Sequence, residues 1–161
     1  MDKSTRFRIG LGGLIFVVTV FGLIVWREEI ARMDAPPRWA IGMAFSLLIG
    51  AFTTWAFLTW LRAHLKLGED PLGRQAHGTL PVPPWLTGGM ERLFFTSIIG
   101  LGISGAPIAM IGWITVKMVS NWNRPGIDPT DARPVRGAFS ALLAGLVSMF
   151  FAGVGGVVCR G

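Results

Sequence analysis

The sequence is poor in charge and in the side chains that carry most enzyme chemistry. It has no tyrosine, one cysteine and two histidines, and charged residues make up only 15% of its 161 residues, against about 25% in an average soluble domain. A single cysteine excludes an intrachain disulfide. Two histidines without a cysteine partner do not supply the three well-placed ligands of a catalytic zinc site. These absences exclude an ordinary soluble domain.

What the sequence has instead is long apolar blocks. Four stretches contain no Asp, Glu, Lys, Arg or His: residues 9–26, 39–61, 93–116 and 137–159. Each is long enough to cross a hydrocarbon core of about 30 Å as a helix. We therefore expect an all-α membrane protein, a four-transmembrane-helix bundle forming a single transmembrane domain over residues 1–161, with a polar loop over residues 62–92. The first block is too long for a signal peptide and lacks a cleavage site, so we expect it to be a retained span.

Small residues recur at intervals of four or eight positions in three of these blocks. The rows are Gly42, Ser46, Gly50 and Thr54; Gly100, Ser104 and Gly112; and Ala144, Ser148, Ala152 and Gly156. Membrane helices associate through close contact at such residues, because lipid tails are as apolar as leucine. We expect these rows to be the helix-packing surfaces. Pro107, inside the third block, predicts a kink there.

No motif in the sequence specifies a reaction. Residues 100–105 match the glycine spacing of a dinucleotide-binding loop, but they lie inside an apolar block, and no acidic residue follows before Asp128. His64 and His77 lack the spacing of a metal site. The net charge of +6 is dispersed over every connection, where Lys and Arg anchor a chain to lipid. We predict no catalytic residue, no metal site, no cofactor and no nucleic-acid partner.

Every Asp, Glu, Lys, Arg and His falls outside the four blocks. Charges inside a membrane mark proton relays, ion pathways and gating charges, so we expect a dry, uncharged interior. This favours a non-enzymatic accessory, assembly or scaffold component of the bacterial cell membrane. The alternative is a small oligomeric transport or channel component for an uncharged solute. The expected partners are the lipid bilayer and either other membrane proteins or further copies of the chain.

Orientation follows from the distribution of basic residues. With four spans, the side that holds both termini and the long loop carries eight Lys and Arg, and the opposite side carries seven. The positive-inside rule then places both termini on the cytoplasmic side.

Two stretches resemble a group of small bacterial multi-pass membrane proteins of no assigned activity. In these, Glu-Arg opens a span, here Met90-Glu91-Arg92-Leu93, and Lys closes it, here Gly112-Trp113-Ile114-Thr115-Val116-Lys117; the last span adds Ser148 and Gly155-Gly156. The resemblance makes Glu91, Arg92 and Lys117 candidate functional residues, together with Pro107. The alternative for the charged residues is an interaction with the helix dipole and anchoring at the membrane surface.

Overall fold

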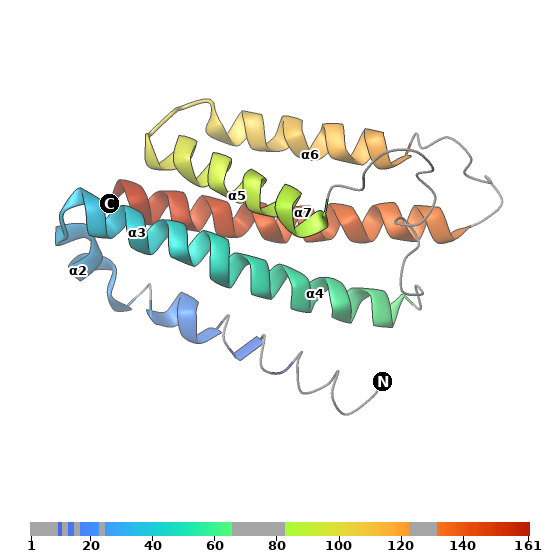
Figure 1. The fold of residues 1–161 in the computed structure, drawn as a ribbon, viewed down its shortest axis with the longest axis horizontal. Helices are drawn as coiled ribbons and strands as arrows, with labels where there is room; N and C mark the ends of the chain where they lie inside the picture. The colour runs from blue at the N-terminus through green and yellow to red at the C-terminus, as the bar shows by residue number, and fades with distance from the viewer. Residues whose placement is uncertain (1–9, 11–12, 15–16, 23–24, 66–82, 123–131) are drawn as a thin grey trace.

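The computed structural model describes residues 10, 13–14, 17–22, 25–65, 83–122 and 132–161; within these ranges the chain is helical with short turns and contains no strand. The all-helical class is confirmed. The first predicted span, residues 9–26, lies partly outside the described residues. Its described residues from Gly10 to Val25 are helical and lead toward α2 (Arg27–Arg32) (Figure 1).

The second predicted span is one long helix with a wider turn in its middle. α3 (Ala35–Ala44), the π-helical segment η1 (Phe45–Ile49) and α4 (Gly50–His64) follow one another without a break. Asp34 stands at the N-cap of α3 without a side-chain capping bond, and prolines occupy the first turn, where a missing N–H costs nothing.

Two helices among the described residues are long and apolar enough to cross a membrane. They are Ala35–His64, with 30 residues, and Arg136–Arg160, with 25 residues, which is most of α7 (Ala132–Arg160). At 1.5 Å per residue they are about 45 and 37 Å long, more than the thickness of a hydrocarbon core. They contain the predicted spans 39–61 and 137–159 and run antiparallel to each other (Figure 1).

The prediction of one helical span over residues 93–116 is wrong. α5 (Pro84–Gly100) and α6 (Ala106–Trp122) are two separate helices of 17 residues each. They run antiparallel on either side of a turn at residues 101–105 (Figure 1). Because α5 begins at Pro84, the last part of the polar loop expected over residues 62–92 is helical as well.

A glycine and a proline explain why the chain turns here. Gly102 has a φ of 72°, a left-handed conformation that costs glycine little. Its N–H donates to the Ile99 carbonyl at 2.9 Å, and the Ile103 N–H donates to the Ile98 carbonyl at 3.0 Å, the Schellman pattern that ends a helix. Pro107 is the second residue of α6. The kink predicted at Pro107 is therefore absent, because proline is well accommodated in the first turn of a helix.

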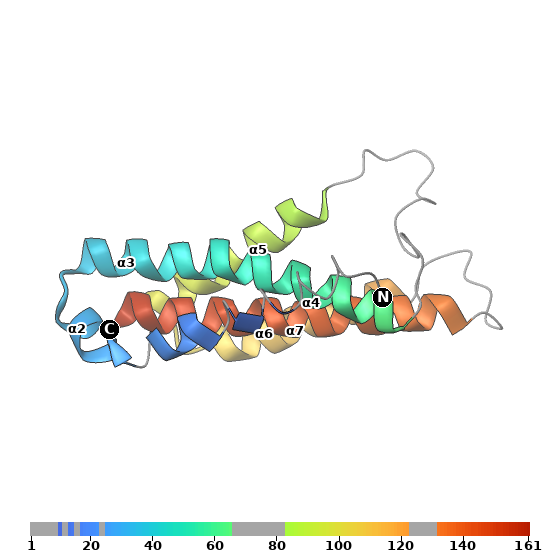
Figure 2. The ribbon, with the colours of Figure 1, turned by 90° about the horizontal axis from the view of Figure 1, so that it is seen from below.

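α7 is the central helix, and α3, η1, α4, α5 and α6 all pack against it. Its Met149 and Ala152 form a buried cluster with Phe95 of α5, and Met110 and Ile114 of α6 cover this cluster. The first turns of α5 lean away from the other helices (Figure 2). Only the second half of α5 therefore belongs to the packed bundle, and this half begins near Glu91 and Arg92.

Candidate functional site

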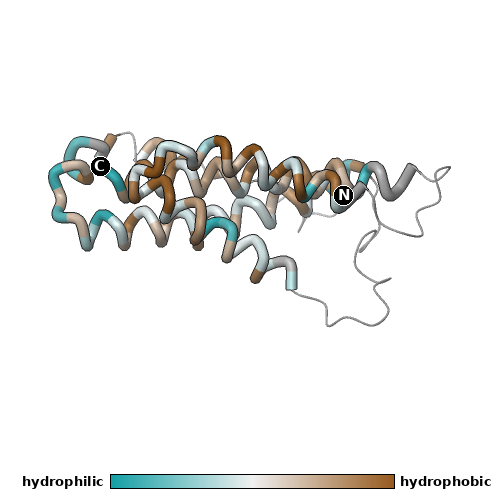
Figure 3. Tube along the Cα trace, turned by 90° about the horizontal axis from the view of Figure 1, so that it is seen from above, coloured by the Kyte–Doolittle hydropathy of each residue, from teal (hydrophilic) through white to brown (hydrophobic). Residues whose placement is uncertain are grey.

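The fold places Arg92 in the middle of the bundle. The Arg92 side chain lies against Gly50, since a Cβ added at Gly50 would be 3.1 Å from its Cδ atom. Gly50 is about 15 Å along the helix axis from both Trp39 and Trp60, at 1.5 Å per residue. Arg92 is 5% exposed. Figure 3 shows a hydrophilic stretch partway along α5, with apolar segments on either side of it.

The expectation of an uncharged interior is therefore wrong. Glu91 and Arg92 precede the third apolar block in the sequence, yet both are buried, at 7% and 5% exposure. The reason is the turn at residues 101–105. It ends the helix at Gly100, so that α5 must begin early and brings its charged pair inside.

The Arg92 guanidinium has more donors than partners. Nη1 donates to Ser148 Oγ of α7 at 2.9 Å, while the buried Nε has no hydrogen-bond partner among the described residues. Gly50 and Gly88 leave room for the side chain; a Cβ at Gly88 would lie 3.6 Å from Nη1. A buried donor without an acceptor costs about 1–3 kcal/mol, so Arg92 is held in an unfavourable place by the packing around it.

Glu91 faces the other way and binds Lys117 of α6. Lys117 Nζ lies 2.7 Å from Oε1 and 2.8 Å from Oε2 of Glu91. The Glu91 side chain is 6% exposed and that of Lys117 is 34% exposed. The pair joins α5 to α6 through two charge-assisted hydrogen bonds, which are short and strong.

A third polar contact lies one helical turn from Arg92, toward the turn at residues 101–105. Thr96 Oγ1 lies 2.7 Å from Ser46 Oγ of η1 and 3.3 Å from the Ala152 carbonyl oxygen of α7. Thr96 and Ser46 are both fully buried. The contact falls at the π-helical turn of the long helix, and π-turns often mark functional positions.

Most residues of the predicted rows lie between helices. A Cβ at Gly42 would be 2.5 Å from the Gly155 carbonyl oxygen, and one at Gly156 would be 2.5 Å from Ile99 Cβ. Gly100 packs in the same way against Cys159. The other members, Ser46, Gly50, Ala144, Ser148 and Ala152, are buried, and Thr54 is half-buried.

The predictions for Ser104 and Gly112 as packing residues are wrong. Ser104 is exposed in the turn between α5 and α6. Gly112 is exposed on α6, and a Cβ added there would have no neighbouring atom within 4 Å. Both predictions assumed one continuous helix, in which Gly100, Ser104 and Gly112 would follow one row of positions spaced by four residues.

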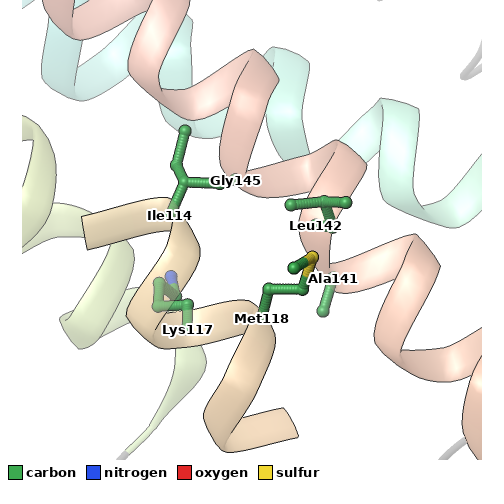
Figure 4. A pocket seen from close by; sticks show the side chains of 6 residues that line it. All are labelled: Ile114, Lys117, Met118, Ala141, Leu142 and Gly145. Atoms are coloured by element: carbon green, nitrogen blue, oxygen red, sulfur yellow. The ribbon is translucent and has the colours of Figure 1, made fainter. Parts of the chain in front are cut away.

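A shallow groove runs between α6 and α7 beside Lys117. It is lined by Ile114, Lys117, Met118, Ala141, Leu142 and Gly145, and Figure 4 shows these side chains on the two facing helices. Its enclosed volume is only about 10 Å³, far below the roughly 300 Å³ at which ligand pockets begin. The groove is the outer side of the contact between the two helices.

The end of the bundle that holds the C-terminus is tied together by Arg38. Its Nε donates to the Cys159 carbonyl oxygen at 3.2 Å, and its Nη1 donates to the Ala31 carbonyl oxygen at 3.4 Å. The Cys159 thiol is buried and lies 3.8 Å from the Trp39 carbonyl oxygen. Arg38 thus links α2, α3 and the end of α7. Sequence reasoning placed Ser46 in a helix-packing row but assigned no role to Arg38.

No group of three or more His, Cys, Asp or Glu side chains that could hold a metal ion occurs in the part of the chain that the structure describes. His77, Glu69 and Asp70 lie outside that part. Comparison with known proteins finds no family model that matches the chain, no similar curated protein and no similar solved structure. The class that the fold defines is an all-helical protein with two helices able to cross a membrane.

Proposed function

We propose that the chain is a multi-pass integral membrane protein of the bacterial cell membrane with a non-enzymatic role as an accessory, assembly or scaffold component. One observation carries this proposal. The polar groups in the middle of the bundle bond from one helix to the next: Arg92 to Ser148, Glu91 to Lys117 and Thr96 to Ser46. In lipid, such contacts and close packing hold helices together.

The surface offered to a partner is the outer face of α6. Ile108 is 76% exposed and Ile111 is 68% exposed, one helical turn apart. α6 packs against α5 and α7 on its other side. A hydrophobic face of this kind can be covered by lipid or by another membrane helix.

Site-specific photo-crosslinking in native membranes tests the proposal. A photoreactive amino acid at Ile108 or Ile111 is expected to capture one membrane protein of discrete mass. The control positions are Leu48, which is 69% exposed on η1, and Ala152, which is fully buried. Ala152 should capture no protein, and Leu48 should not give the band seen from α6. If the α6 positions yield lipid adducts alone, the assembly role is wrong.

The second candidate is a transport or channel component, and the buried charges favour it. An ionisable group in the middle of a membrane bundle is a default sign of a solute or ion pathway. The presence of Glu91 and Arg92 there shifts the alternative from an uncharged solute to an ion. Proteoliposomes containing the purified chain should then pass a small ion, and Arg92→Met should abolish the flux. Arg32→Met, at an exposed position of α2, is the matched control. Absence of flux for chloride, sodium and protons would contradict this candidate.

A further inference from the structure

Buried hydrogen-bond donors without a partner are concentrated on two neighbouring helices. In the ranges that the structure describes, four buried side-chain atoms have no partner: Oγ1 of Thr53 and of Thr54 and Nε of Arg62 on α4, and Nε of Arg92 on α5. All four can donate, and buried donors are almost always paired. Arg62 lies about 12 Å beyond Thr54 along α4, so only the other three can meet at one place.

The packing of the long helix against α5 sets the level of these donors. Ser46 of η1 contacts Thr96, and Gly50 at the start of α4 lies against Arg92. The two helices therefore run antiparallel (Figure 1), and a step of four residues forward along one matches a step of four backward along the other. This register predicts which residues of α4 and α5 share a level nearer the start of α5.

The Arg92 guanidinium and the two threonines lie at one level. The next pair in this register is Thr54 with Gly88, and a Cβ added at Gly88 would be 3.6 Å from Nη1 and 3.7 Å from Nη2 of Arg92. Thr53 and Thr54 are one helical turn beyond Gly50, on the face of α4 that meets α5. Gly88 belongs to the first turns of α5, which lean away from the other helices (Figure 2), so a ligand can approach these donors there.

The positive charge of Arg92 is not balanced inside the bundle. Glu91 is neutralised by Lys117 through two contacts of 2.7 and 2.8 Å. The other acidic residues that the structure describes lie between Glu28 and Asp34, at the end of the bundle that holds the C-terminus (Figure 1), and none of them pairs with Arg92. Buried charges are normally paired, so the excess positive charge favours an anion as the ligand.

We propose that Arg92, Thr53 and Thr54 form a binding site for a carboxylate. The Nε–H of an arginine lies on the same edge of the guanidinium as an Nη2–H, and such an edge binds both oxygens of one carboxylate. Ser148 accepts from Nη1 at 2.9 Å, on the other side of the group, and so leaves the Nε–H for the ligand. The threonine hydroxyls donate to the remaining lone pairs of the same two oxygens.

The depth of the site separates a carboxylate from a lipid phosphate. Gly50, which lies against Arg92, is about 15 Å along the helix axis from Trp39 and from Trp60, and tryptophans are enriched where a membrane meets water. A headgroup phosphate stays at that surface, whereas a carboxylate enters as a small free acid or at the end of an acyl chain. This step rests on the proposed membrane location, but binding requires neither a partner protein nor flux.

NMR of the purified full chain in a neutral detergent, at mildly alkaline pH, tests the site. The probes are acetate and dodecanoate, each isotope-labelled in its carboxyl group, and chloride is the competitor. Addition of the chain is expected to give a saturable change in the chemical shift of the carboxyl signal. Similar affinity for both probes identifies a free acid as the ligand, and much tighter binding of dodecanoate identifies an acid with an acyl chain; both results support the site.

Four variants separate the site from its surroundings. Arg92→Met should abolish the saturable shift, and Arg92→Lys, which keeps the charge but lacks the guanidinium edge, should weaken binding about tenfold. Thr54→Val keeps the shape but removes a donor to a charged ligand, and should also weaken binding about tenfold. Thr59→Val is its matched control and should bind as the unchanged chain does, because the Thr59 hydroxyl already donates to the Trp55 carbonyl at 2.8 Å.

The inference is wrong if neither carboxylate gives a saturable shift, or if chloride at the same concentration displaces both. It is also wrong if either Thr54→Val or Arg92→Met binds as tightly as the unchanged chain. Thr54→Val decides the outcome even where Arg92→Met does not fold, because it leaves the charge of the bundle unaltered. Failure of the assembly role would leave carboxylate binding in detergent unchanged, so the two proposals fail separately.

Discussion

The buried ion pair between Glu91 and Lys117 leads to a quantitative prediction about stability. Replacing Lys117 with Met leaves the Glu91 carboxylate, 6% exposed, without its cation. Breaking a buried pair in this way costs about 3–5 kcal/mol, because the remaining charge must be neutralised or exposed. Replacing Glu91 with Met should cost less, about 1–2 kcal/mol. The Lys117 side chain is 34% exposed, and its ammonium can turn toward water or headgroups.

The double variant should be no less stable than Lys117→Met alone. Two methionines of similar volume remove both desolvation costs together, and apolar replacements of a buried pair are often neutral or stabilising. The expected coupling between the two positions is therefore at least about 1–2 kcal/mol, the cost of Glu91→Met alone, which is above what non-interacting sites show.

Unfolding of the purified full chain by SDS in mixed micelles, followed by tryptophan fluorescence, measures these free energies. The control cycle uses Glu28 and Arg32, which are 3.9 Å apart and 79% and 75% exposed; an exposed pair of this kind contributes little. If the Glu91 and Lys117 changes add without coupling, the two groups do not share a buried contact and the described packing of α6 on α5 is wrong.

Three further substitutions test the packing and the turn. Gly156→Leu should destabilise the bundle by about 3 kcal/mol, because its Cβ would already meet Ile99 at 2.5 Å. Gly112→Leu is its control and should be nearly neutral in the same SDS unfolding. Gly102→Ala should cost about 1 kcal/mol through its positive φ of 72°, whereas Gly105→Ala, which meets open space, should not. Thr96→Val keeps the shape but removes the hydroxyl that meets Ser46; we expect a loss of about 1–2 kcal/mol, and no change would mean that this contact does not form in the membrane.

Much of the helical arrangement could be predicted from local signals. Charge-free blocks of sufficient length located the two long helices, and the small residues at positions such as Gly42 and Gly156 indicated where helices touch. The signals for the turn were also present, since Gly102 and Pro107 are a glycine after one helix and a proline at the start of the next. These two signals were not decisive, because the apolar composition of residues 93–116 predicts one uninterrupted span.

The site could not be predicted, for a physical reason. Whether Glu91 and Arg92 lie at the membrane surface or in its middle depends on where α5 ends, and the sequence position of a charge says nothing about its depth. Ser46 and Thr96 are ordinary residues of apolar helices until a partner lies opposite. Their contact requires α5 and η1 to pack in one register.

The sequence by itself determined that this chain is helical and apolar, because blocks of that length and composition can satisfy their backbone only as helices when water is absent. Only the tertiary structure decided how many helices those blocks make and which residues they bury. A left-handed glycine in the turn converts one predicted span into a helical hairpin. That single reversal brings Glu91, Arg92 and Lys117 into the middle of the bundle and makes α6 end at the opposite end of the bundle from the C-terminus (Figure 1).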